Sequence, residues 1–337
     1  LGPAVLPQSP KMKMTTEIPT SITTPDKVET RLGKLEFFDG FPTEATAQKV
    51  FDSLDFSRGV ETFLNGCPGA SMVALREGLR DIGAIDGTIF VTETLMDAKS
   101  LFLTPNTESI YTGTWLDLSD GPIVVETPPN ILGVLNDFWF RYVADLGNAG
   151  PDQGQGGKFL FVGPGYKGEI PKGYFVYHSP TNGNALIMRG FLVDGDPQPA
   201  VASFKKHARV YPLSRADNPP GQKFINASGL EINTVHGNDF TFFEELNQIV
   251  QEEPAESLDP ELLGLFASIG IKKGQLFEPD ERMKQILTEA AAVGHATVRS
   301  LYCRGRDKAA YQYDNRVGKT GVVGGSHEFL NAGARLL

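Results

Sequence analysis

One ten-residue stretch, NDFWFRYVAD at residues 136–145, constrains the fold more than any other part of the chain. Read as an extended strand, it alternates its side chains between two faces. The apolar face, which predicts a core stripe, consists of Phe138, Phe140, Tyr142 and Ala144. The opposite face consists of Asp137, Trp139, Arg141, Val143 and Asp145. Its two carboxylates, guanidinium and indole are costly to bury unless they are paired or functional.

Residues 86–230 consist of short apolar and aromatic runs that are cut by turn sequences about 10–20 residues apart. No helix-length segments alternate with these runs, so a doubly wound parallel sheet is disfavoured. With 37 Gly, 23 Pro and 22 Phe in 337 residues, the composition favours a turn-rich β protein over a helical bundle or a disordered chain. We therefore predict an α+β fold, an antiparallel, jelly-roll-like β-sandwich with flanking helices and a C-terminal helical segment.

Helical patterns lie on both sides of the β region. Between residues 43 and 82, apolar side chains recur at helical spacing in several segments. Pro68 and Gly69 separate the last two of these segments. Residues 238–303 are helical by the same criterion. A capping box is predicted at residues 241–244. A second helix is predicted to begin at Asp259 and Pro260 and to end near Gly270.

Charge and hydropathy exclude several classes of function. The formal net charge of −10 argues against nucleic acid as a partner, because binding phosphates requires a basic surface. No apolar run approaches the roughly 18–20 residues that cross a bilayer. The N-terminal residues lack the pattern of a signal peptide, so we expect a soluble protein of unspecified compartment. No two of the five His have close metal-ligand spacing, so neither a metal nor a cofactor is predicted.

Several motifs in the same order resemble the family called domain of unknown function 1254. They are LFLTPNTE (101–108), NDFWFR (136–141), GPD (150–152) with GGK (156–158), RGFLVDGD (189–196) and HGND (236–239). The resemblance implies a β-sandwich with helices, usually followed by a second sandwich, domain of unknown function 1214. It implies no established reaction.

The predicted organisation follows from these patterns and from the resemblance. Residues 1–30 are expected to form an extended arm. The chain is expected to be a processed product, a fragment, or a sequence that begins upstream of a true start at Met12 or Met14. Residues 31–230 would form the helices and the sandwich, and residues 231–303 a helical segment. Residues 304–337 resemble the start of the second sandwich, which is expected to be truncated in this chain.

The polar face of residues 136–145 is the first candidate site. On one strand, Asp137, Arg141 and Asp145 would spread over roughly 26 Å, too far for one small ligand. A structural Asp137–Arg141 pair, a ligand site and a catalytic site all remain open for this face. Trp139 is expected either in the core or stacked on a sugar. Partners for ligand binding could come from Asn106 and Arg189 on neighbouring segments.

His236 is the best candidate for a general base, because the unperturbed pKa of histidine lies near neutrality. It precedes Asp239, a further candidate for ligand binding, by three residues and lies beside a predicted helix start. The alternative is structural, with Asn238 or Asp239 capping the helix and His236 anchoring the loop.

Two hypotheses for the function follow. The first is a non-catalytic protein that binds a small molecule or glycan, or that serves as a subunit of a homo-oligomer or larger assembly. The second is a hydrolase or lyase with His236 as base, Arg141 or Arg189 on an anion, and Asp137 or Asp145 orienting the partners. Convergence of His236, Arg141 and a carboxylate in an open cleft would favour the enzyme. A closed Asp137–Arg141 pair would favour the binding protein.

Overall fold

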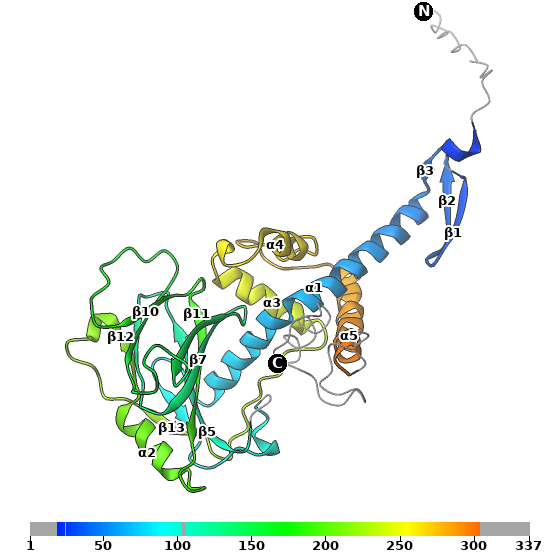
Figure 1. Cartoon of the computed structure of the whole chain (residues 1–337). Coiled ribbons are helices and arrows are strands. Elements are labelled where there is room, and N and C mark those ends of the chain that lie inside the picture. Colours follow the sequence, from blue (N-terminus) through cyan, green and yellow to red (C-terminus); the bar gives the residue numbers. More distant parts are fainter. Residues whose placement is uncertain (1–18, 24, 103–105, 304–337) are drawn as a thin grey trace, which may run out of the picture. The chain divides into compact units, whose positions relative to one another are not determined.

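The structure, a computed structural model, describes residues 19–23, 25–102 and 106–303. The chain divides into two compact units, Leu1–Leu54 and Asp55–Leu337. Helix α1 (Glu44–Asp81) begins in the first unit and continues into the second (Figure 1). Most of the predicted N-terminal arm and the whole predicted start of a second sandwich (304–337) lie outside the described residues, so those boundaries stay predictions.

The first unit contains an antiparallel sheet in the order β1-β2-β3, formed by Lys27–Thr30, Gly33–Phe38 and Phe41–Pro42. Asp39 and Gly40 join β2 to β3 with φ angles of 46° and 83°, as a type I′ hairpin turn requires. Polar contacts link the sheet to α1: Thr46 Oγ1 accepts from the Glu36 N–H at 2.8 Å. None of the strand residues of this unit is buried.

Two larger sheets form the second unit. The six-stranded sheet has the order β13-β4-β5-β11-β7-β8, and the four-stranded sheet has the order β10-β9-β6-β12. Neighbouring strands are antiparallel except for the pairs β13–β4 and β10–β9. The strands are β4 (Ile89–Val91), β5 (Ser109–Asp117), β6 (Ile123–Glu126), β7 (Ile131–Asp137), β8 (Tyr142–Gly147), β9 (Lys158–Val162), β10 (Phe175–His178), β11 (Gly183–Phe191), β12 (Arg209–Pro212) and β13 (Phe224–Asn226).

The two sheets enclose one apolar core between them. Residues of the six-stranded sheet such as Leu135 and Leu186 pack with Phe159 and Phe161 of the four-stranded sheet. Phe204 of α2 (Gln198–His207) closes this core. The prediction of a mixed α/β protein with antiparallel sheets is therefore confirmed, whereas a jelly-roll topology is not confirmed.

Helices cover the other face of the six-stranded sheet. The second-unit part of α1 packs there with α3 (Thr241–Glu252), α4 (Pro260–Ala267) and α5 (Glu281–Cys303). These helices gather along α1 in Figure 1. Their shared core includes Phe63 and Met72 of α1, and Trp115 and Phe138 from the sheet side. Among the described residues, no helix is both long and apolar enough to cross a membrane.

The predicted break at Pro68 is wrong, because α1 runs without interruption through Pro68 and Gly69. A proline inside a helix costs about 3 kcal/mol, so tertiary packing must compensate. Gly69 shows one part of that packing. A Cβ atom at Gly69 would lie 2.8 Å from the indole of Trp139, so only glycine lets this ring approach the helix.

The predicted helix starts had mixed outcomes. The prediction of a capping box at residues 241–244 is wrong. The side chain at this helix start is that of Asp239, whose Oδ1 accepts from the Thr241 N–H at 2.9 Å. The start at Asp259 and Pro260 is confirmed, with Asp259 Oδ1 accepting from the Glu261 N–H at 2.8 Å. Gly270 follows α4 with a φ of 99°, as predicted for a residue at a helix end.

Candidate functional site

Residues 136–145 form a hairpin and not one strand. β7 ends at Asp137, β8 begins at Tyr142, and Phe140 in the turn has a φ of 60°. The Asp137 side chain explains the reversal, because its Oδ1 accepts from the N–H groups of Trp139 (2.9 Å) and Arg141 (2.8 Å). The single-strand prediction and its separation of roughly 26 Å are therefore wrong.

The turn also brings Asp137 and Arg141 into contact. Arg141 Nε donates to Asp137 Oδ2 at 2.7 Å, and Arg141 Nη2 donates to the Ser257 carbonyl at 2.6 Å. Burial raises the pKa of the Asp137 carboxyl, while hydrogen bonds and charge from Arg141 act in the opposite direction. Both ionised groups are thus occupied by neighbours within the protein.

The segment that follows α3 completes this region, which we call the Asp137 corner (residues 137–141, 181–183 and 253–257). Trp139 Nε1 donates to Ser257 Oγ at 3.0 Å. Glu253, only 3% exposed, accepts from the N–H groups of Asn182 (2.6 Å) and Gly183 (2.8 Å). Burial raises the pKa of the Glu253 carboxyl to about 7.

A small cavity of about 160 Å³ adjoins this corner. Trp139 and Glu253 line it together with mostly apolar residues of α3, α4 and the segment between them. Trp139 is only 6% exposed and belongs to the helix-side core. The core placement, one of the two expected for Trp139, is therefore the one observed.

His236 lies elsewhere, in the loop before α3. Its Nδ1 is 2.7 Å from the Gly237 carbonyl, so this nitrogen carries the hydrogen in that contact. The ring packs edge-on against Phe63 and Phe242. Burial lowers the pKa of His236, which favours the neutral imidazole. Within the described part of the chain, none of its polar contacts reaches Arg141 or Asp137.

The remaining predicted ligand-binding residues divide among three places. Asn106 and Arg189 meet at Tyr111, whose hydroxyl accepts from the Asn106 N–H at 2.9 Å and whose ring lies 5.1 Å from Arg189 Cζ. Asp145 accepts from the Tyr142 hydroxyl at 3.2 Å. Asp239 caps α3, and hydrogen bonds from Thr241 lower the pKa of its carboxyl.

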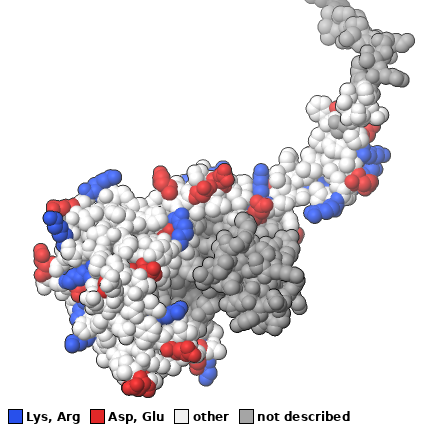
Figure 2. Space-filling model, viewed as in Figure 1, with Lys and Arg blue, Asp and Glu red and all other residues white. Residues whose placement is uncertain are grey.

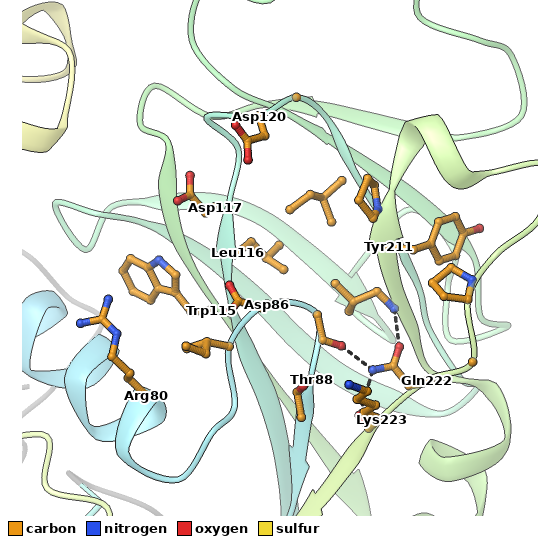
Figure 3. A pocket seen from close by; sticks show the side chains of 18 of the residues that line it. Arg80, Asp86, Thr88, Trp115, Leu116, Asp117, Asp120, Tyr211, Gln222 and Lys223 are labelled. Atoms are coloured by element: carbon orange, nitrogen blue, oxygen red, sulfur yellow. Dashed lines mark hydrogen bonds between the residues drawn. The ribbon is translucent and has the colours of Figure 1, made fainter.

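A larger cavity, of about 500 Å³, lies at another place in the second unit. We call it the Trp115 pocket. Figure 3 shows Arg80 and Trp115 on one side and Tyr211 and Gln222 on the other. Gln222 holds one wall together, because its Nε2 donates to the Gly87 carbonyl at 2.6 Å and its Oε1 accepts from the Val210 N–H at 2.8 Å.

Charged side chains of both signs line this pocket. The acidic ones are Asp86, Asp117 and Asp120, and the basic ones are Arg76, Arg80 and Lys223. Arg76 pairs with Glu252, and Arg80 pairs with Glu77. Within the described residues, the side chains of Asp86, Asp120 and Lys223 make no hydrogen bond or ion pair. The pocket therefore presents free acceptors and a free donor beside two paired guanidinium groups.

The Asp137 corner supports the pocket from behind. Phe138 packs edge-to-face on Trp115 with ring centroids 4.8 Å apart, and Arg76 Cζ lies 4.7 Å from the Phe138 ring. Gly183 permits this packing, since a Cβ atom there would lie 2.6 Å from Phe138 and 2.7 Å from Trp115. The charge pair of the corner thus fixes the turn that positions one pocket wall.

No group of three or more His, Cys, Asp and Glu side chains that could hold a metal ion occurs in the described ranges. The acidic side chains of the Trp115 pocket therefore do not form a metal cluster.

Comparisons with known proteins support the fold. Residues 87–212 match the family model described as "Protein of unknown function (DUF1254)". This match confirms the resemblance. The matched region includes β5 to β12 and therefore Trp115, Asp117, Asp120 and the Asp137–Arg141 turn. The comparison with curated proteins finds no match.

Two solved structures are similar. The crystal structure of the VPA0106 protein of Vibrio parahaemolyticus has a TM-score of 0.55 and 15% identity over 84% of this chain. This chain spans 65% of the length of that structure. An uncharacterised protein of Burkholderia cenocepacia has a TM-score of 0.26 and 10% identity, covering 72% of this chain and 57% of its own. At 15% identity, the Vibrio structure supports the fold alone.

Sequence reasoning missed the residues of the Trp115 pocket. They come from the end of α1, the segment before β4, the end of β5, and the segments around β12. Two signals were present: the turn sequence at residues 119–122, and the fact that Trp115 is one of only two tryptophans.

Proposed function

We propose that this protein is a non-catalytic binder of a small hydroxyl-rich molecule, such as a sugar unit of a glycan, in the Trp115 pocket. The observation that carries the proposal is the set of free polar groups in a cavity of about 500 Å³. This volume falls in the range of about 300–1,000 Å³ typical of small-molecule sites.

The balance of charges favours a neutral ligand. Asp86 and Asp120 can accept hydrogen bonds from hydroxyl groups, while Arg80 and Lys223 can donate to them. A sugar hydroxyl donates and accepts, so it can satisfy both kinds of group. A strongly anionic ligand would meet three carboxylates, and a strongly cationic ligand would meet three basic side chains.

The aromatic walls contribute shape more than stacking. Trp115 is 6% exposed and Tyr211 is 2% exposed, so each offers little of its ring to a ligand. Binding must therefore depend on the polar groups at the rim. This dependence makes the proposal sensitive to single charge-neutralising substitutions.

The hydrolase or lyase alternative gains no support from the contacts of its residues. It requires His236, Arg141 and a carboxylate in one cleft. His236 packs against Phe63 and Phe242, whereas Arg141 pairs with Asp137 and Ser257. We therefore favour the binding hypothesis.

Tryptophan fluorescence can test the proposal, because each of the two indoles lies at a different cavity. In Trp139→Phe, the emission reports Trp115 alone. Titration of this variant with neutral monosaccharides and disaccharides is expected to shift the emission, whereas Trp115→Phe should show no shift. Calorimetry on the unsubstituted chain supplies the affinity, and an equal affinity for Trp139→Phe checks that this substitution has not altered the site.

Substitutions at the rim then locate the site. Asp86→Asn and Asp120→Asn should each weaken binding about tenfold, the loss expected when one charged hydrogen bond is removed. Glu231→Gln, an exposed acid outside the pocket, is the matched control and should bind normally. The proposal fails if no hydroxyl-rich compound binds, or if both rim variants bind as well as the control.

A further inference from the structure

The described part of the first unit exposes several large apolar side chains to water. It exposes Phe38 and Phe41 at 75% each and Phe51 at 58%. Four aliphatic side chains are also exposed: Ile22, Leu32, Val50 and Leu54, of which Leu32 is the least exposed. We call Ile22, Phe38, Phe41, Val50, Phe51 and Leu54 the unit 1 apolar surface. Exposed apolar groups on this scale mark interaction surfaces.

The hairpin and the helix each present part of this surface. Phe38 and Phe41 are directly paired across β2 and β3, on either side of the Asp39-Gly40 turn, so their side chains lie on one face of the hairpin. Val50, Phe51 and Leu54 lie within one turn of α1 and share one side of that helix.

Nothing within the described part of this unit covers the surface. Every strand residue of β1, β2 and β3 is at least partly exposed. The sheet is joined to α1 by polar contacts, through Thr46 and through Lys49, whose Nζ donates to the Lys34 carbonyl at 3.1 Å. A small sheet without a buried face is only marginally stable in water. Burial of the unit 1 apolar surface against another apolar surface would therefore stabilise this unit.

We propose that two copies of this chain associate through the unit 1 apolar surface. One whole aromatic side chain has an area of about 150–250 Å². With this area, a somewhat smaller one for the aliphatic side chains, and the exposed fraction of each, the six residues together expose roughly 600 Å². Two such surfaces placed against each other bury about 1,200 Å², which reaches the lower limit for a specific interface. The same patch on both copies is what a two-fold symmetric dimer uses.

The charge of this unit permits self-association. Residues 19–54 contain four basic and six acidic residues, a net charge of −2, whereas the whole chain carries −10. Lys34 and Glu36 pair at 2.7 Å, so part of this charge is neutralised locally. On the face shown in Figure 2, blue and red side chains are interspersed. Repulsion between copies is therefore weak where the apolar side chains lie.

Sedimentation of the full chain over a wide concentration range tests the proposal. The unsubstituted chain is expected to form dimers, and Phe38→Ser with Phe41→Ser is expected to weaken association at least about tenfold. Leu276→Ser is the matched control, because Leu276 is 83% exposed in the second unit. This control should dimerise normally.

A second variant, Phe51→Ser, does not depend on hairpin folding, because Phe51 lies on α1. It should also weaken association while leaving the circular dichroism unchanged. The proposal is overturned if the unsubstituted chain is monomeric throughout, or if these Phe variants dimerise like Leu276→Ser. Sugar binding in the Trp115 pocket should persist in every variant, so failure of one proposal is distinguishable from failure of the other.

Discussion

The Asp137 corner and the Trp115 pocket each contain one of the two tryptophans of this chain. They differ in whether their acidic side chains have partners within the protein. In the corner, Asp137, Arg141 and Glu253 all have partners within the protein. In the pocket, Asp86 and Asp120 face a cavity without a partner among the described residues. Charges that are paired within the protein maintain a local structure, whereas unpaired charges around a cavity are available to a ligand.

Loss of the Asp137 carboxylate should give the largest effect. Asp137→Ala would leave the N–H groups of Trp139 and Arg141 without their acceptor and would remove the buried partner of the Arg141 guanidinium, and each unsatisfied buried group costs about 1–3 kcal/mol. We expect the free energy of unfolding to fall by about 3 kcal/mol. Urea denaturation measures this change. Asp145→Ala, which loses one contact at 3.2 Å, is the control and should change stability far less.

The pH dependence of stability tests the role of Glu253. Its raised pKa, about 7, means that the folded state holds a proton that the unfolded state has released. The free energy of unfolding should therefore fall as the pH rises from about 5 to about 7 and then level off. Burial also raises the pKa of Glu245 to about 7, so this residue changes the free energy of unfolding with pH in the same direction.

Denaturant midpoints measured across this window check the sign. Glu253→Gln should flatten the slope, and Glu245→Gln should flatten it independently, because the two groups accept from different N–H groups. A stability that rises through this window, or a slope that neither variant changes, would contradict the assignment.

Phe138 lies between the two regions, so a substitution at this residue should affect both of them. Phe138→Leu keeps most of the side-chain volume, so we expect a loss of about 1 kcal/mol in stability. Because Phe138 contacts both Trp115 and Arg76, the same substitution should shift the emission of Trp115 in the Trp139→Phe background. An unchanged spectrum would show that the corner does not support the pocket wall.

The smallest effect on stability is expected at the rim of the pocket. Arg80 pairs with Glu77 on the exposed surface of α1, and such pairs contribute about 0.2–1 kcal/mol. Arg80→Gln should therefore leave the thermal unfolding temperature nearly unchanged while weakening ligand binding. If it destabilises the protein as much as Asp137→Ala, the distinction between the two regions is wrong.

Local sequence signals predicted the elements that depend on local chemistry. The helix start at Asp259 and Pro260 depends on one side chain and one fixed φ angle within a few residues. The β region between residues 86 and 230 was likewise predicted from runs and turns. The family model matches residues 87–212, which contain all the quoted motifs except HGND. The long helix through Pro68 was missed, because the helix is held by tertiary packing, such as that of Trp139 against Gly69, with residues far along the chain.

For the corner, the residue pattern established that Asp137, Trp139 and Arg141 required partners. Periodicity could not show that Asp137 caps a turn whose Arg141 and Trp139 are then bound by Ser257. The pocket depended still more on the folded state. Its polar groups come from four segments that are distant in sequence, and they share a cavity only after both sheets and α1 have packed.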